Sequence, residues 1–577
     1  MRTLLLLLLL QLPFLLFMWL VPPERRTPSR KVSAWLLAGL SLLAAGSGIL
    51  HLYWEDGNFA RFSFVFAVCA ALGAVARAKG WIGPDDPDPL LDAGGLAEPR
   101  ATGGDAQSAA DPAVDAGAAA LLERYRRPAV LLHRPYPPHA GPPGNSHFGG
   151  LPAFAVGMEW PRTSAGVPLH FLCQVDFADM HWTTPLPDHG VLLVFVRDDD
   201  AQQRSSGRAG DDFRILYAPE AAAGPTEAPA DLPPIGWDFP RGPYREVQLD
   251  GEPHQRLHVA WPIQPLEMDS FPDQSGLPEL IAHSERAWQQ WSHEYQVRKS
   301  LHERDPSVRR FPTAPDDPEE AAVWDRYGEL LPAARAAALE AATGTPIYEE
   351  PGYAAEAQAN RRVFEDGSFP SHWIFIHYFA RIALRRSRRD PPSDADTAAA
   401  AIADAEARLD RAARAWFDRS CALPLESPVD ETDRAAFRAW AANIRRDPRS
   451  RAGSDAPGWA AEAAFWVIRS WAGNRRLAGT IPPSAYEAVA GRFHASRVSR
   501  GGEKDWYHFH FCQMLGHATS SQEAAPADGT EVCLLNLASD RALGWSFWDC
   551  GEIGFWIAPE DLAARDFSRV RMSVNGH

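Results

Sequence analysis

The segment from Trp506 to Cys512 is the part of this sequence best suited to metal chemistry, because aromatic residues alternate there with histidine and cysteine. In a strand, every second side chain points to the same face, so Trp506, His508, His510 and Cys512 would lie together. Imidazole and thiolate groups are ligands that suit zinc or iron. The segment could therefore begin the metal site of a metal-assisted hydrolase.

Such a site needs one or two further ligands from elsewhere in the chain, and the spacing of the sequence singles out none. The candidates are His494, His517 and Asp549. A half-buried strand whose polar groups are satisfied explains the same alternation, and we favour this interpretation. We therefore expect no bound metal and no cofactor.

Two further histidines stand in a segment whose pattern predicts an aromatic helix, from His372 to Leu384. His372 and His377 are five residues apart, so they do not lie squarely on one helix face. We interpret them as packing residues rather than as a pair of ligands.

Two carboxylates precede a glycine in turn sequences, Asp188 in Asp188-His189-Gly190 and Asp549 in Asp549-Cys550-Gly551. Turn-capping side chains are the simpler interpretation, and we favour it. A paired-carboxylate site requires that the fold bring the two together.

The same two turns suggest an internal repeat. Asp179 precedes Asp188 by nine residues, and Asp540 precedes Asp549 by the same nine. An apolar strand is predicted before each first aspartate and after each glycine. We hypothesise a duplicated strand–loop–strand unit whose halves pair across one sheet or pseudo-barrel. Coincidence is the alternative, and unrelated surroundings for the two turns would contradict the repeat.

Composition and missing motifs exclude several classes of protein. The chain has 57 Lys and Arg against 74 Asp and Glu, a formal net charge of -17. Because nucleic-acid affinity depends on neutralising phosphates, we expect no nucleic-acid partner. The six cysteines form no C-x-x-C pair, and no P-loop, dinucleotide-binding, H-E-x-x-H or G-x-S-x-G motif is present. These absences lean against an enzyme.

The N-terminal 82 residues contain three apolar segments, and we predict transmembrane helices at 4–21, 32–53 and 62–78. Arginine and lysine cluster between the first and second segments and after the third. The positive-inside rule therefore places the rest of the chain in the cytoplasm. Two alternatives remain open: the first segment is a cleaved signal peptide, or the short third run only lies on the membrane, which reverses the topology.

The remainder divides into four predicted regions. Residues 83–120 are rich in Pro, Gly, Ala and Asp and predict a disordered acidic linker. Residues 121–276 and 498–577 predict mainly β structure, and 277–497 predict a helical insert. The helices that we expect are Leu280–Val297, Glu319–Ala342, His372–Leu384, Thr397–Asp418, Asp433–Ile444, Trp459–Trp471 and a last one that begins with a Ser484–Glu487 capping box.

Two groups of motifs, at residues 129–260 and 506–577, resemble those of a known family. The first group is Gly149-Gly150-Leu151-Pro152, Glu159-Trp160-Pro161, Leu169-His170-Phe171-Leu172-Cys173-Gln174-Val175-Asp176 and Leu186-Pro187-Asp188-His189-Gly190. The second group is Gln513-Met514-Leu515-Gly516, Leu534-Leu535, Trp548-Asp549-Cys550-Gly551 and Ile557-Ala558-Pro559-Glu560-Asp561-Leu562. In this order they resemble the YwqG-like family, a bacterial domain of unknown function.

The resemblance implies an α+β fold dominated by antiparallel sheet, with no established reaction, cofactor or catalytic residue. The chain departs from the family pattern at His517-Ala518, where an aromatic residue and proline are expected, and in its membrane block and long insert. The candidate ligand-binding residues are Trp160, Asp188, His508, His510, Gln513 and Asp549.

We expect a non-catalytic binding or interaction module, held at the inner membrane of a bacterium with its soluble part facing the cytoplasm. One alternative is the metal-assisted hydrolase with His508, His510 and Cys512. The other is a sensor that holds a small molecule or peptide between the sheet and the tryptophan-rich insert. A pocket there, lined by aromatic residues with few polar groups, would support the sensor.

Overall fold

The computed structural model describes a large part of the chain after residue 110, and all of it belongs to one compact unit, residues 106–577. The described ranges are 111–199, 210–220, 226–236, 248–249, 252, 254–272, 318–346, 348–349, 353–386, 397–444, 456–493, 497–498, 512–518, 530–547 and 551–575.

The three predicted transmembrane segments lie outside these described ranges. None of the helices within the ranges is both long and apolar enough to cross a membrane.

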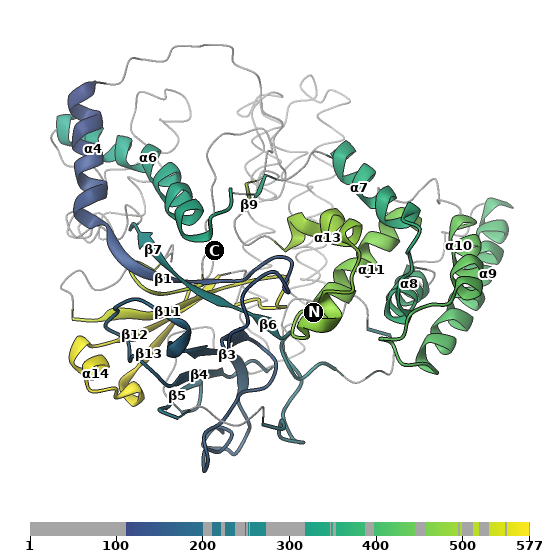
Figure 1. The fold of residues 1–577 in the computed structure, drawn as a ribbon, viewed down its shortest axis with the longest axis horizontal. Coiled ribbons are helices and arrows are strands. Elements are labelled where there is room, and N and C mark those ends of the chain that lie inside the picture. The colour runs from purple at the N-terminus through teal and green to yellow at the C-terminus, as the bar shows by residue number, and fades with distance from the viewer. Residues whose placement is uncertain are drawn as a thin grey trace, which may run out of the picture. The chain divides into compact units, whose positions relative to one another are not determined.

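The fold is a mixture of α and β structure with two antiparallel sheets and a helical insert (Figure 1). The six-stranded sheet, sheet A, combines strands from both ends of the described chain. Its pairing order is β13 (Arg571–Asn575), β12 (Glu552–Ile557), β11 (Val532–Ala538), β10 (Gln513–Leu515), β1 (Arg127–His133) and β7 (Gln264–Ser270).

The five-stranded sheet, sheet B, is built only from the first part of the domain. Its pairing order is β5 (Phe213–Ala218), β4 (Val191–Val196), β3 (His170–Asp176), β2 (His147–Phe148) and β6 (Trp261–Pro262). All six residues of β4 are buried, as expected for a continuous apolar run that is covered on both faces.

The two sheets repeat the same arrangement. Strands β13, β12, β11, β10 and β1 follow one another in sheet A as β5, β4, β3, β2 and β6 do in sheet B. The register shifts at the same place in each central hairpin, after the second residue of β3 and after the second residue of β11. Two consecutive residues with positive φ also occur at matching positions, Gly149 and Gly150 in one sheet and Leu515 and Gly516 in the other.

The sheets pack face to face, and one hydrophobic core contains residues from both. The rings of Phe213 on β5 and Phe555 on β12 meet edge to face, 5.6 Å apart between centroids. Phe148 on β2 packs in the same way against Trp545, at 4.9 Å. The expectation that the two strand–loop–strand units pair across one sheet was therefore wrong, because each unit lies in its own sheet.

Two helices cover the other face of sheet A, and one of them corrects the predicted linker. α4 (Pro112–Tyr125) begins at Asp111, whose carboxylate accepts from the Ala113 N–H at 2.9 Å. It packs on α6 (Pro318–Thr343), and α6 contacts β7. Residues 112–120 are thus helical, because burial against α6 stabilises a segment that composition alone predicted to be disordered; residues 83–110 lie outside the described residues.

The helices predicted from periodicity between 319 and 471 are present. One of them is α6, and the others lie in the helical insert proper, residues 353–489, which also contains two helices that the sequence did not suggest, α7 and α12. The predicted helix at 280–297 lies outside the described residues. The insert's helices are α7 (Tyr353–Glu365), α8 (Trp373–Arg386), α9 (Thr397–Cys421), α10 (Glu431–Ala442), α11 (Ala456–Trp471), α12 (Arg475–Ala478) and α13 (Pro483–Val489). In Figure 1 they lie on a different side of the strands from α4 and α6.

The predicted capping box at α13 was wrong. The helix begins after Pro482 without a side-chain cap. The Ser484 hydroxyl instead donates to the Asp366 carboxylate at 2.7 Å, which ties α13 to the turn that follows α7. The Ser484 hydroxyl therefore makes its hydrogen bond to Asp366 and does not cap the first turn of α13.

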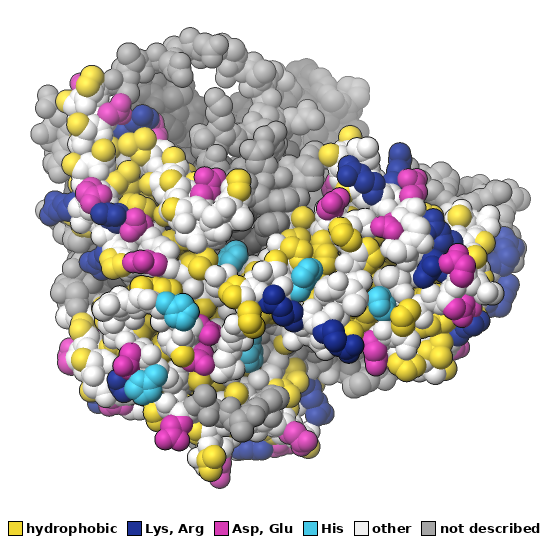
Figure 2. Space-filling model, in the orientation of Figure 1, with side chains coloured by type: hydrophobic (Ala, Val, Ile, Leu, Met, Phe, Trp, Pro, Cys, Tyr) yellow, Lys and Arg dark blue, Asp and Glu magenta, His cyan; other side chains and the backbone are white. Residues whose placement is uncertain are grey.

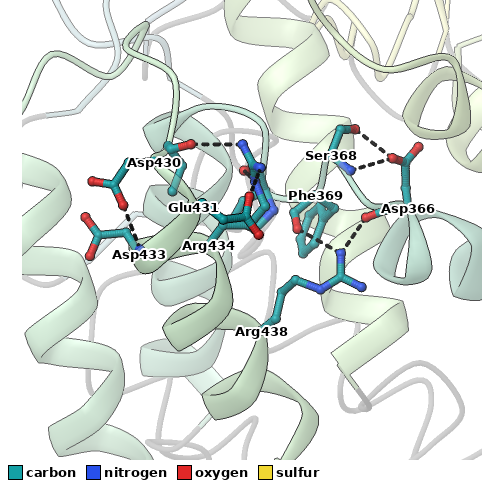
Figure 3. A network of polar contacts seen from close by, with 10 residues as sticks. Asp366, Ser368, Phe369, Asp430, Glu431, Asp433, Arg434 and Arg438 are labelled. Atoms are coloured by element: carbon teal, nitrogen blue, oxygen red, sulfur yellow. Dashed lines mark hydrogen bonds and ion pairs between the residues drawn. The ribbon is translucent and has the colours of Figure 1, made fainter.

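The turn between α7 and α8 is held by two arginines of α10 (Figure 3). Arg438 donates to the carbonyl oxygens of Asp366 and Phe369, at 2.5 and 3.1 Å. Arg434 donates to the carbonyl oxygens of Pro370, in the turn, and of Val429, at 3.5 and 2.9 Å, and it pairs with Glu431 at 2.7 Å. These charged groups bind backbone and neighbouring helix residues, so we interpret the network as structural.

The remaining short elements complete the unit. They are the parallel strand pair β8 (Tyr348–Glu349) and β9 (Arg497–Val498), the helix α14 (Pro559–Ala563), and 3₁₀ turns at Phe177–Asp179, Ala490–Arg492 and Phe567–Arg569.

Candidate functional site

A cleft of about 500 Å³ lies where sheet B meets the helical insert. One wall consists of Gly150 after β2 and of described residues between 248 and 260, which precede β6. The other wall consists of His377, Tyr378 and Arg381 from α8 and of Trp466, Arg469 and Ser470 from α11. The volume is in the range of small-molecule sites in proteins.

The sheet wall of the cleft depends on two close backbone approaches. Gly150 has φ of +71° and donates its N–H to the carbonyl of His258 at 3.0 Å. Gly473, just after α11, lies so near Ala260 that a Cβ at Gly473 would stand 2.5 Å from the Ala260 Cβ. Small residues therefore allow the chain before β6 to contact both the Gly149–Gly150 turn and the insert.

A chain of hydrogen bonds connects the two walls through Arg381. The Arg381 Nε donates to Nε2 of His377 at 2.9 Å, and its Nη2 pairs with the Glu252 carboxylate at 2.6 Å. Because Nε2 of His377 accepts, the neutral ring carries its proton on Nδ1 and donates it to the Ser420 hydroxyl at 3.0 Å. Desolvation, with a smaller contribution from Arg381, lowers the pKa of His377 to about 4. His377 is thus neutral at physiological pH and orients Arg381.

The second guanidinium of the cleft belongs to Arg469, which is only 3 % exposed. Its Nε donates to the Ala542 carbonyl at 2.7 Å, and its guanidinium lies 4.7 Å from the Trp466 ring centre. Trp466 is stacked with Tyr378 at 6.2 Å, and the Tyr378 hydroxyl bonds to Ser470 at 2.6 Å. The helical wall therefore presents guanidinium, hydroxyl and aromatic groups held by packing from behind.

A buried Asp–His contact lies behind the sheet wall. The His258 Nε2 is 3.0 Å from the Asp198 carboxylate, and both side chains are almost fully buried. The backbone N–H of Asp198 donates to Nδ1 of His170 at 3.2 Å. An Asp–His pair can act as a general base, but this one is shielded from solvent. We interpret it as the support that fixes the sheet wall.

These groups can bind and orient a polar ligand. Guanidinium and amide groups orient polar ligands, and aromatic faces stack on planar ones. His377 has a pKa too low for efficient base catalysis at neutral pH. Within the described ranges, no group of three or more His, Cys, Asp or Glu residues could hold a metal ion.

The structure places Trp160 and Asp188 away from the lining of the cleft. Trp160 donates its indole N–H to the Leu169 carbonyl at 2.7 Å and packs edge to face on Phe195, on the outer face of sheet B. Asp188 is an exposed turn residue whose carboxylate meets His189 at 2.6 Å. This hydrogen bond lowers the pKa of Asp188. Both positions have structural explanations.

The candidates near β10 are either buried or outside the described ranges. The Gln513 side chain is 1 % exposed and donates to the carbonyl of His517. Burial raises the pKa of the Cys512 thiol to about 12, so the thiol is protonated at neutral pH. Burial also lowers the pKa of His517 to about 4. His494, His508, His510 and Asp549 lie outside the described residues.

Sequence reasoning missed Glu252, Arg381 and Arg469. One signal was present, because Arg381 follows His377 by four residues and the two therefore share a face of α8. His377 was interpreted as a packing residue, and the structure places it both in the packing against α9 and in the lining of the cleft.

Arginine side chains also gather over α9 and α10, to the right in Figure 2. Arg419 on α9 pairs with Asp433 on α10 at 2.5 Å, and Arg434 pairs with Glu431. These arginines join helices to one another or to nearby carboxylates. We therefore interpret this charged surface as a solvated face rather than as a binding site.

The two walls of the cleft differ in their similarity to known proteins: the sheet wall lies in segments that match a family model, and the helical wall lies between those segments. The model of the family described as "Domain of unknown function (DUF1963)" matches residues 146–330 and 479–575. The interval 331–478 between the two segments contains α7 to α11, so the matched part supplies the sheet wall and the interval supplies the helical wall. No curated protein matches this chain. The chain is thus similar to an uncharacterised domain in two segments that flank most of the helical insert.

Proposed function

We propose that this chain is a non-catalytic binding protein whose ligand, a small polar molecule, occupies the cleft between sheet B and the helical insert. The observation that carries the proposal is the position of the cleft. Its walls come from α8 and α11 on one side and from the segment before β6 on the other. A site between two parts of a fold is a common place for a ligand.

The lining is more polar than the aromatic-lined pocket that would support a sensor, and it therefore favours a polar ligand. It includes glutamine, glutamate, histidine and arginine side chains in addition to Trp466 and Tyr378. Buried polar groups reject ligands that leave them without hydrogen bonds, which gives such a site specificity.

Filling the cleft is expected to abolish ligand retention. Ser470 is an exposed residue that lines the cleft at the end of α11, so Ser470→Trp should occupy the space with little cost to the core. The measurement is mass spectrometry of small molecules extracted from the purified full-length chain. We expect at least one compound to fall by about tenfold or more in the variant.

Thr432→Trp is the matched control, because Thr432 is exposed on α10 and is absent from the lining of the cleft. It should retain the compound at the level of the unchanged protein. Equal recovery from all three proteins would contradict the assignment of the cleft as the ligand site.

We also propose that the two sheets derive from one duplicated unit, supported by their equal strand order, register shifts and positive-φ positions. The pairing registers make residues 258–260 of sheet B equivalent to residues 127–129 of β1. In sheet A these residues pair with β7, whereas β6 is the last strand of sheet B as described. In sheet B the equivalent residues line the cleft.

We further propose that residues 1–82 hold this binding protein at the inner membrane, with the domain in the cytoplasm. The support is the three apolar segments and the distribution of Arg and Lys around them. Attachment to a membrane raises the local concentration of a domain near membrane-bound partners.

Deletion of residues 2–82 is expected to move the chain from the membrane fraction to the soluble fraction of cell lysates. Deletion of 83–105, which leaves the apolar segments in place, should keep it in the membrane fraction. Protease added to intact spheroplasts should spare the domain and should degrade it only after lysis. Release of the full-length chain by alkaline carbonate would refute the anchoring, and digestion in intact spheroplasts would reverse the topology.

A further inference from the structure

The Glu252–Arg381 ion pair is the polar contact that crosses the cleft from the sheet wall to the helical wall. Its atoms are 2.6 Å apart and both side chains are largely buried. Partial burial strengthens the attraction relative to a surface pair. The site therefore already holds one carboxylate on one of its two arginines.

Arg381 is positioned independently of Glu252. Its Nε is held by His377, and its guanidinium lies 5.5 Å from the Phe417 ring centre on α9. His377 is fixed in turn by Ser420, whose hydroxyl donates to the Phe417 carbonyl at 2.6 Å. A guanidinium held in this way is preorganised to receive an oxyanion.

Glu252 keeps local hydrogen-bond partners when it leaves Arg381. One carboxylate oxygen pairs with Arg381, and the other accepts the Leu249 N–H at 2.9 Å. The backbone of Glu252 is held locally as well, by the Gln248 side chain at 2.8 Å and the Leu249 carbonyl at 3.2 Å. Loss of Arg381 would leave Glu252 with these local partners and with access to water.

Resting on the proposed function, we infer that the ligand of the cleft carries a carboxylate or phosphate group that takes the place of Glu252 on Arg381. Arg469 lines the same cleft, and the Tyr378–Trp466 stack lies beside it. The guanidinium fork matches the paired oxygens of carboxylate and phosphate groups. Glu252 is then a built-in competitor that occupies the anion position while the cleft holds no ligand.

The inference predicts opposite effects for the two partners of the ion pair. Glu252→Gln keeps the shape and an acceptor for Leu249 but weakens the competition, so affinity for an anion should rise about tenfold. Arg381→Gln should lower the same affinity by about thirtyfold or more. Arg381→Lys keeps the charge without the fork and should lie between the unchanged protein and Arg381→Gln.

The test is isothermal titration calorimetry of the full-length protein and these variants with benzoate, phenyl phosphate and benzamide. Benzamide has the shape of benzoate without its charge, so it should bind weakly and respond little to Glu252→Gln. The tighter of the two anions identifies the group. Ser470→Trp must abolish the binding, and a melting curve of each variant verifies folding.

The outcomes separate the two proposals. If benzamide binds as well as benzoate and Ser470→Trp abolishes both, the cleft is a ligand site but the anion inference is overturned. If Glu252→Gln weakens binding of the anions, Glu252 is a ligand contact rather than a competitor, and the inference is overturned again. If no probe binds the unchanged protein and Ser470→Trp retains every compound found on it, the proposed function itself fails.

Discussion

Replacing Phe555 with alanine should lower the free energy of unfolding by about 3–5 kcal/mol, because it removes a large side chain from a site that is too well packed to collapse. Phe555 on β12 is 0 % exposed and lies in the core shared by both sheets. A typical domain is stable by only about 5–15 kcal/mol, so the loss would be a large fraction of the total. The change is measured by urea denaturation of the full-length protein, with tryptophan fluorescence as the probe of unfolding.

Phe213→Ala and the double variant provide the control. The two rings are 5.6 Å apart in an edge-to-face pair, for which a coupling of about 0.5–1.5 kcal/mol is expected. Strict additivity of the two single changes would mean that the rings do not touch in solution, and would contradict the face-to-face packing of the sheets.

The elements that were predicted well are those whose signal is local. The buried run at 191–196 has the same bounds as β4, because six consecutive apolar residues between turn signals suit few other structures. The helices at 319–342, 397–418 and 459–471 were placed within three residues of α6, α9 and α11 at each end, because their apolar periodicity extends over several turns.

The features that were missed depend on contacts between distant parts of the chain. β1 pairs with β10, although Leu131 and Gln513 are separated by most of the domain, and no local pattern specifies that partner. Glu252 and Arg381 are 129 residues apart in sequence, so neither signals the cleft by itself. α4 was predicted as linker because its composition is poor in large apolar residues, and α6 supplies the surface that orders it.

The Gly149-Gly150 pair was visible in the sequence, but the reason for its first glycine is a backbone contact. Gly149 has φ of +55°, and a Cβ there would stand 2.2 Å from the carbonyl oxygen of Val259. The equivalent position in sheet A is Leu515, which adopts φ of +61° with a full side chain. The two copies thus share a backbone conformation, and the steric demand for glycine arises from the chain that borders the cleft.

Gly149→Ala is therefore expected to lower the free energy of unfolding by about 2–5 kcal/mol, the sum of left-handed strain and overpacking against backbone that cannot rotate away. Gly157→Ala is the matched control, because Gly157 has φ of +85° and its Cβ would meet nothing within 4 Å. It should cost only the strain, about 1–2 kcal/mol.

The difference between these two glycine variants isolates the clash with Val259. A Gly149 variant as mild as the Gly157 variant would mean that the segment before β6 moves freely, and the sheet wall of the cleft would then not be fixed. A much larger loss for Gly149→Ala would mean that this wall is rigid. Ligand entry would then require movement of the Glu252 side chain, which can leave Arg381 while the backbone before β6 stays in place.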